Sequence, residues 1–296
     1  MSTLQNKIDF AVVLRVKCAN PNGDPLNGNR PRTDYDGLGE ITDVCLKRKI
    51  RDRLQENGKA IFVQSDDRKN DDARSLRERA EKSLGNKFGS AETAKLACAT
   101  WMDVRTFGQL FALPKKKKKN DKKDTAISTP NENMKNEKDN EGDTGISIPI
   151  RGPVSVQSAF SVQPVDVTST QITKSVSGEG DGGKRGSDTM GMKHRVDHGI
   201  YVFFGSMNPQ LAEKTGFSDD DAEAIKQVLP RMFENDASSA RPEGSMEVLK
   251  LIWWKHNCKS GQHSSAKVHR SLTVKPDGKV DLARLEGLVP EQIEGF

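Results

Sequence analysis

Basic side chains at helical spacing give this sequence its clearest chemical signal. Lys47, Arg48 and Arg51 fall in a segment predicted to be helical, where positions 47 and 51 share one face. Ile50 and Leu54 would turn toward the core. Flexible cations close to a helix N-terminus suit the phosphates of a nucleic-acid backbone. A run of charge on a helix is also typical of a solvated surface, so both interpretations stay open at this point.

A turn-rich loop precedes this helix and carries two more arginines. Asn-Gly pairs and prolines occur repeatedly over residues 20–32, which predicts consecutive turns. Thr42 is expected to cap the helix, which runs to about Glu56. We expect the loop to bring Arg30 and Arg32 toward the same surface as the helix cations.

A glycine-rich segment matches two phosphate-binding patterns in part. Residues 178–184 satisfy both GxGxxG and the GxxxxGK portion of a phosphate loop. Arg185 occupies the place where the phosphate loop needs a Ser or Thr for magnesium, and residues 186–191 do not predict the helix that must follow. We therefore expect the tip of a flexible hairpin here rather than a nucleotide site.

The histidines and cysteines have spacings that suit neither a metal site nor a catalytic site. His194 and His198 are four apart, but their segment runs into a predicted strand, where such positions are far separated. A looser group has irregular spacing: His256, Cys258, His263 and His269. No cofactor and no metal are expected. Acid–base catalysis by histidines, as in a metal-independent ribonuclease, stays an alternative.

Residues 114–145 have the composition of a segment that cannot be buried. Five consecutive lysines, Lys115–Lys119, are followed by a mixture of Asn, Asp, Glu and Lys. Such a segment is predicted to be a solvated loop or an arm that touches nucleic acid, and the sequence leaves both readings open.

Composition restricts the class of protein and the mode of binding. Aromatic residues make up 5% of the 296 residues, and no basic-aromatic run is present, which disfavours base stacking on a sheet. A binder built from this chain would hold the backbone and leave base edges free. There is no apolar run of the roughly 18 residues that a membrane span needs. An N-terminus without an apolar core and four scattered cysteines favour a reduced, cytoplasmic setting.

Hydrophobic periodicity predicts the elements that must position these residues. Ser218 with Asp221 resembles a capping box at the start of a helix. Strands are predicted at Ile8–Val16, in a period-2 stripe of residues 148–162, at Gln171–Val176, at Gly199–Gly205 and at Met246–Trp254. The order strand, helix, strand, strand, helix, strand indicates a ferredoxin-like or RRM-type βαββαβ fold.

Several strings of this sequence resemble the backbone subunit of the type I-C CRISPR Cascade. They begin with Asn20-Pro21-Asn22-Gly23-Asp24-Pro25 and continue, in the order of the family, through residues 41–51, 103–108, 151–154, 189–194 and 211–218. The resemblance extends from about Ile8 to Cys258. The lysine-rich residues 114–145 depart from the family pattern.

The resemblance implies an α+β fold: a modified ferredoxin-like palm with large insertions and a protruding thumb hairpin. Residues 1–296 would form a single RRM-like domain. A helical insertion over residues 57–145 would end in the lysine-rich loop 114–145, and residues 172–205 would form the thumb.

The resemblance also implies a function without catalysis. Family members stack as a helical filament along one CRISPR RNA, alongside the processing, large and small subunits of Cascade, and present the guide for pairing with target DNA. The alternatives are a metal-independent CRISPR endoribonuclease that processes guide RNA, and a monomeric basic RNA chaperone.

Transferred position by position, the resemblance suggests nine RNA-binding residues. Thr42, Lys47, Arg48 and Arg51 would contact guide phosphates, with Arg30 and Arg151 as companions. Met190, Lys193 and His194 would lie near the thumb. Met190 or Met192 would either insert between bases or pack within the hairpin.

Overall fold

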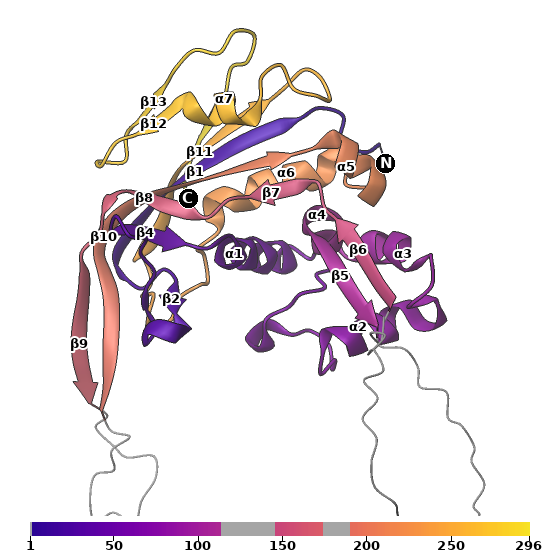
Figure 1. Cartoon of the computed structure of the whole chain (residues 1–296), viewed down its shortest axis with the longest axis horizontal. Coiled ribbons are helices and arrows are strands. Elements are labelled where there is room, and N and C mark those ends of the chain that lie inside the picture. Colours follow the sequence, from indigo (N-terminus) through magenta and orange to yellow (C-terminus); the bar gives the residue numbers. More distant parts are fainter. Residues whose placement is uncertain (1, 114–145, 174–189) are drawn as a thin grey trace, which may run out of the picture.

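The computed structural model describes residues 2–113, 146–173 and 190–296, which build one large antiparallel sheet with helices on both faces (Figure 1). The strand order is β14-β11-β1-β10-β8-β4, and β7 and β9 also pair with β10. These strands are β1 (Ile8–Ala19), β4 (Leu38–Ile41), β7 (Val154–Val156), β8 (Ala159–Pro164), β9 (Val167–Thr173), β10 (Met190–Met207), β11 (Met246–Lys255) and β14 (Glu291–Glu294). The predicted mixture of helices and strands is confirmed.

The central strand β1 is apolar on both sides because both faces of the sheet are covered. Phe10 and Val12 pack in the main core, whereas Ala11 belongs to a second cluster on the opposite face. A strand with alternating faces in two cores reads as a nearly continuous apolar run. The strand predicted at Ile8–Val16 is confirmed, and it continues to Ala19.

Helices α1 and α6 cover one face of the sheet, below it in Figure 1. Ile50 and Leu54 of α1 are fully buried there, as predicted. The capping box at α6 is also confirmed, since Ser218 Oγ accepts from Asp221 N and Asp221 Oδ2 accepts from Ser218 N. The helices are α1 (Asp43–Glu56), α2 (Leu76–Leu84), α3 (Thr93–Thr100), α4 (Met102–Phe107), α5 (Pro209–Thr215), α6 (Asp219–Val228) and α7 (Ser265–Arg270).

The opposite face of the sheet is covered by the C-terminal residues 256–296, here called the C-terminal cap. It contains α7 and the hairpin of β12 (Leu272–Val274) and β13 (Val280–Leu282), which lie above the sheet in Figure 1. Val268 and Leu288 of the cap pack on Trp254 of β11. This face of the sheet is therefore closed to a ligand.

The chain after α1 forms a separate packing unit with its own small core. Helices α2, α3 and α4 pack with a hairpin of β5 (Gly108–Leu113) and β6 (Ile146–Arg151) around Phe62, Trp101 and Phe111. The predicted loop 114–145 lies outside the described residues.

The period-2 stripe of residues 148–162 is not one strand, and this part of the prediction is wrong. It is divided among β6, β7 and β8, of which β6 pairs with β5 outside the main sheet. The phase also changes after Val156, so Ala159 and Ser161 are buried and Phe160 is partly exposed. Gly152 permits the break because a Cβ there would lie 2.3 Å from the carbonyl oxygen of Thr106.

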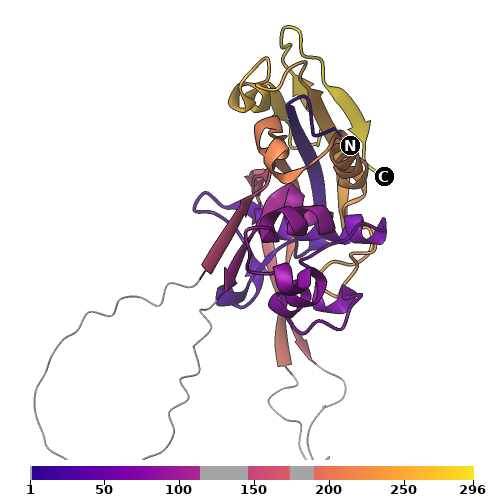
Figure 2. The same cartoon turned by 90° about the vertical axis from the view of Figure 1, so that its right-hand side faces the viewer.

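Strands β9 and β10 continue beyond the sheet as a two-stranded ribbon, here called the hairpin arm. Its register runs from Met190 opposite Thr173 to Val196 opposite Val167. The arm stands away from the sheet in both views (Figures 1 and 2). Residues 174–189, which include the predicted hairpin tip, lie outside the described residues.

Two short strands, β2 (Gly23–Asp24) and β3 (Arg30–Pro31), order the loop that precedes α1. Within the described residues, no helix combines the length and the apolar character needed to cross a bilayer.

Candidate nucleic-acid interface

The loop before α1 is fastened to the first turn of that helix by one side chain. Asn22 Oδ1 accepts hydrogen bonds from Thr42 N (3.0 Å) and Thr42 Oγ1 (2.9 Å). Thr42 Oγ1 in turn accepts from Cys45 N at 3.3 Å, which is the predicted N-cap. The hydroxyl of Thr42 is therefore occupied in joining loop to helix, and its predicted contact with a phosphate stays untested.

The same loop reaches the hairpin arm through Arg30. Arg30 Nη1 donates to Ser169 Oγ at 2.7 Å, and His194 Nδ1 lies 2.8 Å from the same oxygen. Arg30 comes from β3, Ser169 from β9 and His194 from β10, so three distant segments meet at one hydroxyl. The structure thus brings together two of the predicted site residues.

The charge of Arg30 is left available by this contact. Serine is neutral, and Arg30 makes no ion pair among the described residues. A guanidinium in such a position retains both its charge and several donors for an incoming phosphate.

The two methionines of the arm lie on the same face as His194. Side chains alternate along β10, so Met190, Met192 and His194 share one face, opposite Thr173, Gln171 and Ser169 of β9. Met190 and Met192 are 65% and 55% exposed. Of the two notebook-free alternatives for them, packing within the described part of the arm is disfavoured by this exposure, although Gln171 Nε2 does lie 3.5 Å from Met190 Sδ.

Lys193 is the exception among the residues predicted on the arm. It lies between Met192 and His194 in sequence, so it points to the opposite face of the ribbon, with Thr170 across from it. Lys193 cannot act on the same ligand surface as His194 unless the ligand wraps around the arm.

The cations of α1 are engaged by carboxylates of the chain itself. Lys47 Nζ lies 2.9 Å from Asp43, and Arg48 Nη2 lies 2.7 Å from Asp52. Arg48 also donates to the carbonyl oxygen of Val63 at 2.6 Å. These contacts reduce the positive charge that the predicted face of α1 presents to a ligand.

Arg51 is the most strongly engaged of these residues. Its Nε donates to Asp103 Oδ2 at 3.0 Å, and its guanidinium lies 4.9 Å from the centre of the Phe107 ring. Burial lowers the pKa of Arg51, and the facing carboxylate of Asp103 opposes that shift. Asp103 itself is buried and also accepts from the backbone N–H groups of Phe62 and Val63. Arg51 therefore joins α1 to the unit formed by α2–α4.

Arg151 lies at the end of β6, in a different surface from the loop and arm. It lines a groove between α3 and α5, together with Lys95 and Lys214. Arg151 is exposed and makes no ion pair within the described part of the chain. It is a free cation, but the geometry does not place it beside Arg30.

Sequence reasoning missed two residues of this region. Ser169 links Arg30 to His194, yet it is one of several hydroxyl residues in a polar strand and carries no distinguishing signal. Asp103 neutralises Arg51 from 52 positions away, and it occurs inside a string, residues 103–108, that already carried the family resemblance.

The remaining motifs contribute no site. β10 begins at Met190, so a strand is found where a phosphate loop needs a helix, and residues 178–184 lie outside the described residues. Across residues 2–113, 146–173 and 190–296, no group of three or more His, Cys, Asp or Glu side chains could hold a metal ion.

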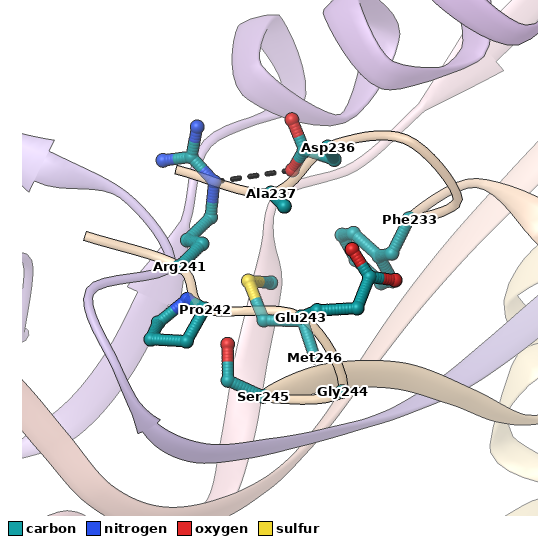
Figure 3. Close-up of a pocket in the computed structure, with 9 residues that line it drawn as sticks. All are labelled: Phe233, Asp236, Ala237, Arg241, Pro242, Glu243, Gly244, Ser245 and Met246. Atoms are coloured by element: carbon teal, nitrogen blue, oxygen red, sulfur yellow. Dashed lines mark hydrogen bonds and ion pairs between the residues drawn. The ribbon is translucent and has the colours of Figure 1, made fainter. Parts of the chain in front are cut away.

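A small pocket between residues 233 and 246 has a structural role (Figure 3). Its volume is about 10 Å³, close to the minimum for one water molecule. Asp236 on its wall accepts from Arg241 Nε at 3.1 Å and also pairs with Lys49 of α1. The pocket thus lies beside an ion-pair network that attaches this loop to α1.

Comparison with known proteins identifies relatives across most of the chain. The family described as "CRISPR-associated protein Cas7" matches residues 6–287. A protein of that description from Haloferax volcanii is 29% identical over 255 residues, which cover 81% of this chain and 67% of that protein.

Two solved structures are also similar. A chain of a "CRISPR RNA-guided surveillance complex, pre-nicking" has a TM-score of 0.42 and 15% identity, and covers 84% of this chain and 78% of that one. A chain of a "CRISPR RNA-guided surveillance complex" has a TM-score of 0.40 and 16% identity, with coverages of 84% and 68%.

Proposed function

Since the chain belongs to the Cas7 family of CRISPR-associated proteins, we propose that it is a non-catalytic backbone subunit that binds CRISPR RNA in a surveillance complex of type I-C. Several copies coat one guide RNA beside the processing, large and small subunits. The guide bases remain free to pair with target DNA, so sequence is read by base pairing and the protein holds the backbone.

The observation that carries this proposal is the junction of Arg30, Ser169 and His194. It places an un-neutralised guanidinium at the base of a protruding arm, next to a face that exposes two methionines. A phosphate fits the guanidinium, and an apolar side chain fits between unstacked bases. A backbone contact combined with an apolar wedge would bend a single strand at each copy of the arm.

The covered sheet supports the same division of labour. In an RRM the open face of the sheet stacks bases on aromatic side chains. Here the C-terminal cap packs on that face through Val268 and Leu288. Binding through the loop and arm leaves the bases unread by the protein.

We also propose that the core is a modified ferredoxin-like or RRM-type palm. The elements β1, α1, β8, β10, α6 and β11 follow one another in the βαββαβ order. β1 lies between β10 and β11, and both helices pack on one face, which supports this assignment.

The alternative of a metal-independent endoribonuclease has less support. His194 is the histidine at the proposed interface, and its Nδ1 is engaged by Ser169. His198 is four positions further along a strand, roughly 13 Å away, so the two imidazoles are too far apart to act as an acid–base pair. We propose that the chain does not cut the RNA it binds.

A double substitution tests the proposed interface. Arg30→Ala with His194→Ala should weaken binding to single-stranded RNA about ten-fold and make the salt dependence shallower by about one phosphate contact. Binding is measured by fluorescence anisotropy over a series of salt concentrations.

A matched control removes the same two groups from the C-terminal cap. Arg284→Ala with His263→Ala should leave both affinity and salt dependence within two-fold of wild type (about 0.4 kcal/mol). Equal effects of the two double variants would contradict the interface, because they would show only a loss of net charge.

A further inference from the structure

A short turn before β4 presents an aromatic side chain to solvent on a rigid frame. In this turn, residues 34–37, Asp34 Oδ1 accepts from Asp36 N (3.0 Å) and Leu38 N (2.8 Å). Asp34 also pairs with Leu38 through the backbone, and Gly37 O accepts from Val165 N at 3.1 Å. Tyr35, held between two aspartates, is fully exposed. We call residues 34–37 the acidic turn.

An exposed tyrosine on a rigid turn is suited to insertion into a protein surface. Tyrosine supplies a large contact area at a small cost in conformational entropy, and it is enriched at the centres of interfaces. A nucleic-acid contact is disfavoured at this point because Asp34 and Asp36 flank the ring, and neither makes an ion pair within the described residues. The turn therefore fits a partner with a basic rim and an apolar floor.

The groove between α3 and α5 has these two properties. Its volume is about 1120 Å³, above the roughly 300–1,000 Å³ typical of small-molecule pockets. The floor is built from small apolar residues, among them Ala94 and Ile150, and Leu211 lies on the α5 side.

Four cations surround this floor without neutralisation. Lys59, Lys95, Arg151 and Lys214 line the groove, and none of them forms an ion pair among the described residues. The fifth cation, Arg105, is neutralised by Asp221 through contacts of 2.7 and 2.9 Å. The groove thus has an excess of positive charge together with an apolar floor.

A polyanion is a poorer occupant of this groove than an acidic, aromatic segment. Its walls include Asp220 and Glu213 as well as the cations, and these carboxylates would repel a continuous phosphate backbone. A turn with two discrete carboxylates and one ring can pair with the cations and bury its ring on the floor.

The acidic turn and the groove lie at opposite ends of the molecule. In Figure 1, β4, which follows the turn, lies toward the left, whereas α3, α5 and β6, which line the groove, lie toward the right. One chain cannot join its own two surfaces across the α1 region between them. Two copies can do so, and each then offers a free surface at either end.

We propose that the acidic turn of one copy docks into the α3–α5 groove of the next, with Tyr35 on the apolar floor and Asp36 facing Lys95 and Lys214. Such a head-to-tail contact does not close on itself, so it builds an open chain of copies. This inference rests on the proposed function, because the guide RNA supplies the path along which the copies are arranged.

Two variants separate the two halves of the contact. Tyr35→Ala removes the docking side chain, and Lys95→Glu with Lys214→Glu reverses the rim of the groove. All of these residues are exposed, so folding should be unchanged, which thermal unfolding verifies. Assembly is followed by analytical ultracentrifugation, without RNA and on a single-stranded RNA long enough for several copies.

Each variant alone should bind a short, single-copy RNA within about two-fold of wild type. On the long RNA, each should require at least ten-fold more protein to reach full loading. An equimolar mixture should form pairs but no longer chains, because the Tyr35→Ala copy keeps its groove and the double variant keeps its turn.

Matched controls change the C-terminal cap instead. Val289→Ala removes another exposed apolar side chain, and Lys267→Glu with Arg270→Glu makes the same change in net charge. Both should assemble like wild type.

Three results would overturn the inference: normal assembly by Tyr35→Ala, absence of pairs in the mixture, or an effect of the groove variant on the short RNA alone. The last result would identify the groove as an RNA site. Failure of wild-type protein to bind the short RNA would instead contradict the proposed function, and assembly without RNA would still report on the contact itself.

Discussion

A basic side chain binds phosphate with whatever part of its charge the chain itself leaves un-neutralised. Arg51 faces the buried carboxylate of Asp103, whereas Arg30 faces only the hydroxyl of Ser169. Partner identity, rather than residue type or clustering, therefore separates a structural arginine from one that can bind a ligand.

Single substitutions on α1 should reveal this difference. Arg51→Ala leaves Asp103 buried without its partner, so we expect a loss of about 3–5 kcal/mol in the free energy of unfolding. Lys47→Ala removes only a partly exposed pair within one helix, and about 0.5 kcal/mol or less is expected. Urea denaturation measures both.

RNA binding by the same two proteins is then compared under conditions where both remain folded. Arg51→Ala should retain most of its affinity. A large loss of affinity together with unchanged stability would show that Arg51 contacts RNA directly.

A buried aspartate attaches the C-terminal cap to the sheet. Asp9 Oδ2 accepts from His256 Nε2 at 2.9 Å, and His269 Nε2 lies 3.5 Å from Asp9 Oδ1. Gln262 N donates to His256 Nδ1 at 2.9 Å, so His256 is held as the neutral tautomer that donates to Asp9. Burial alone would raise the pKa of Asp9, but the hydrogen bonds from His256, His269 and Ser265, with the charge of Lys7, hold it well below its usual value.

The depressed pKa makes a prediction about acid stability. An aspartate of this kind stabilises the fold above its unfolded pKa of 3.8, and the contribution is lost as the pH falls below that value. Asp9→Asn should therefore lower the free energy of unfolding at pH 7 by several kcal/mol and flatten its decline below pH 4. Urea denaturation from pH 2.5 to pH 7 tests this, and parallel curves for the two proteins would contradict it.

The loop before α1 acts as a spacer between the helix and the hairpin arm. Asn22 holds its beginning to Thr42, and Arg30 holds its end to Ser169. Gly23 permits the tight path, since a Cβ there would lie 2.1 Å from Asn29 Oδ1. The position of Arg30 relative to α1 thus depends on a few polar contacts.

Loosening this loop should reduce binding without touching a ligand contact. Asn22→Ala removes both hydrogen bonds to Thr42, which we expect to cost about 1–3 kcal/mol of stability. RNA affinity should fall several-fold, and hydrogen exchange should rise at the amides of the loop and of Cys45. Unchanged exchange in the loop combined with weaker binding would instead assign a direct RNA contact to Asn22.

The accuracy of the sequence predictions follows how local their causes are. The cap at Thr42, the capping box at Ser218 and the apolar face of α1 depend on neighbouring residues, and all are confirmed. The stripe of residues 148–162 failed because the partner of each strand sets which side is buried, and β6 pairs outside the main sheet.

Long-range partners explain what the sequence could not supply about the site. Ser169 meets Arg30 across 139 positions, and Asp103 meets Arg51 across 52. No periodicity or motif predicts such pairs, so the α1 cations and Arg30 were equivalent candidates until the fold distinguished them.

The whole molecule separates two kinds of surface. The C-terminal cap closes one face of the sheet, while α1, the loop and the hairpin arm lie on the other side (Figure 1). Contacts to RNA and contacts between copies then use different surfaces: the arm and loop for the former, the acidic turn and the α3–α5 groove for the latter. This arrangement allows each copy to hold RNA and its neighbours at once.

The most direct test of the central claim is native mass spectrometry of the purified protein with single-stranded RNAs of increasing length. The account predicts that the number of bound copies rises in equal steps with RNA length, and that the RNA is recovered uncut after prolonged incubation without metal. One bound copy at every length, or steady shortening of the RNA, would contradict it.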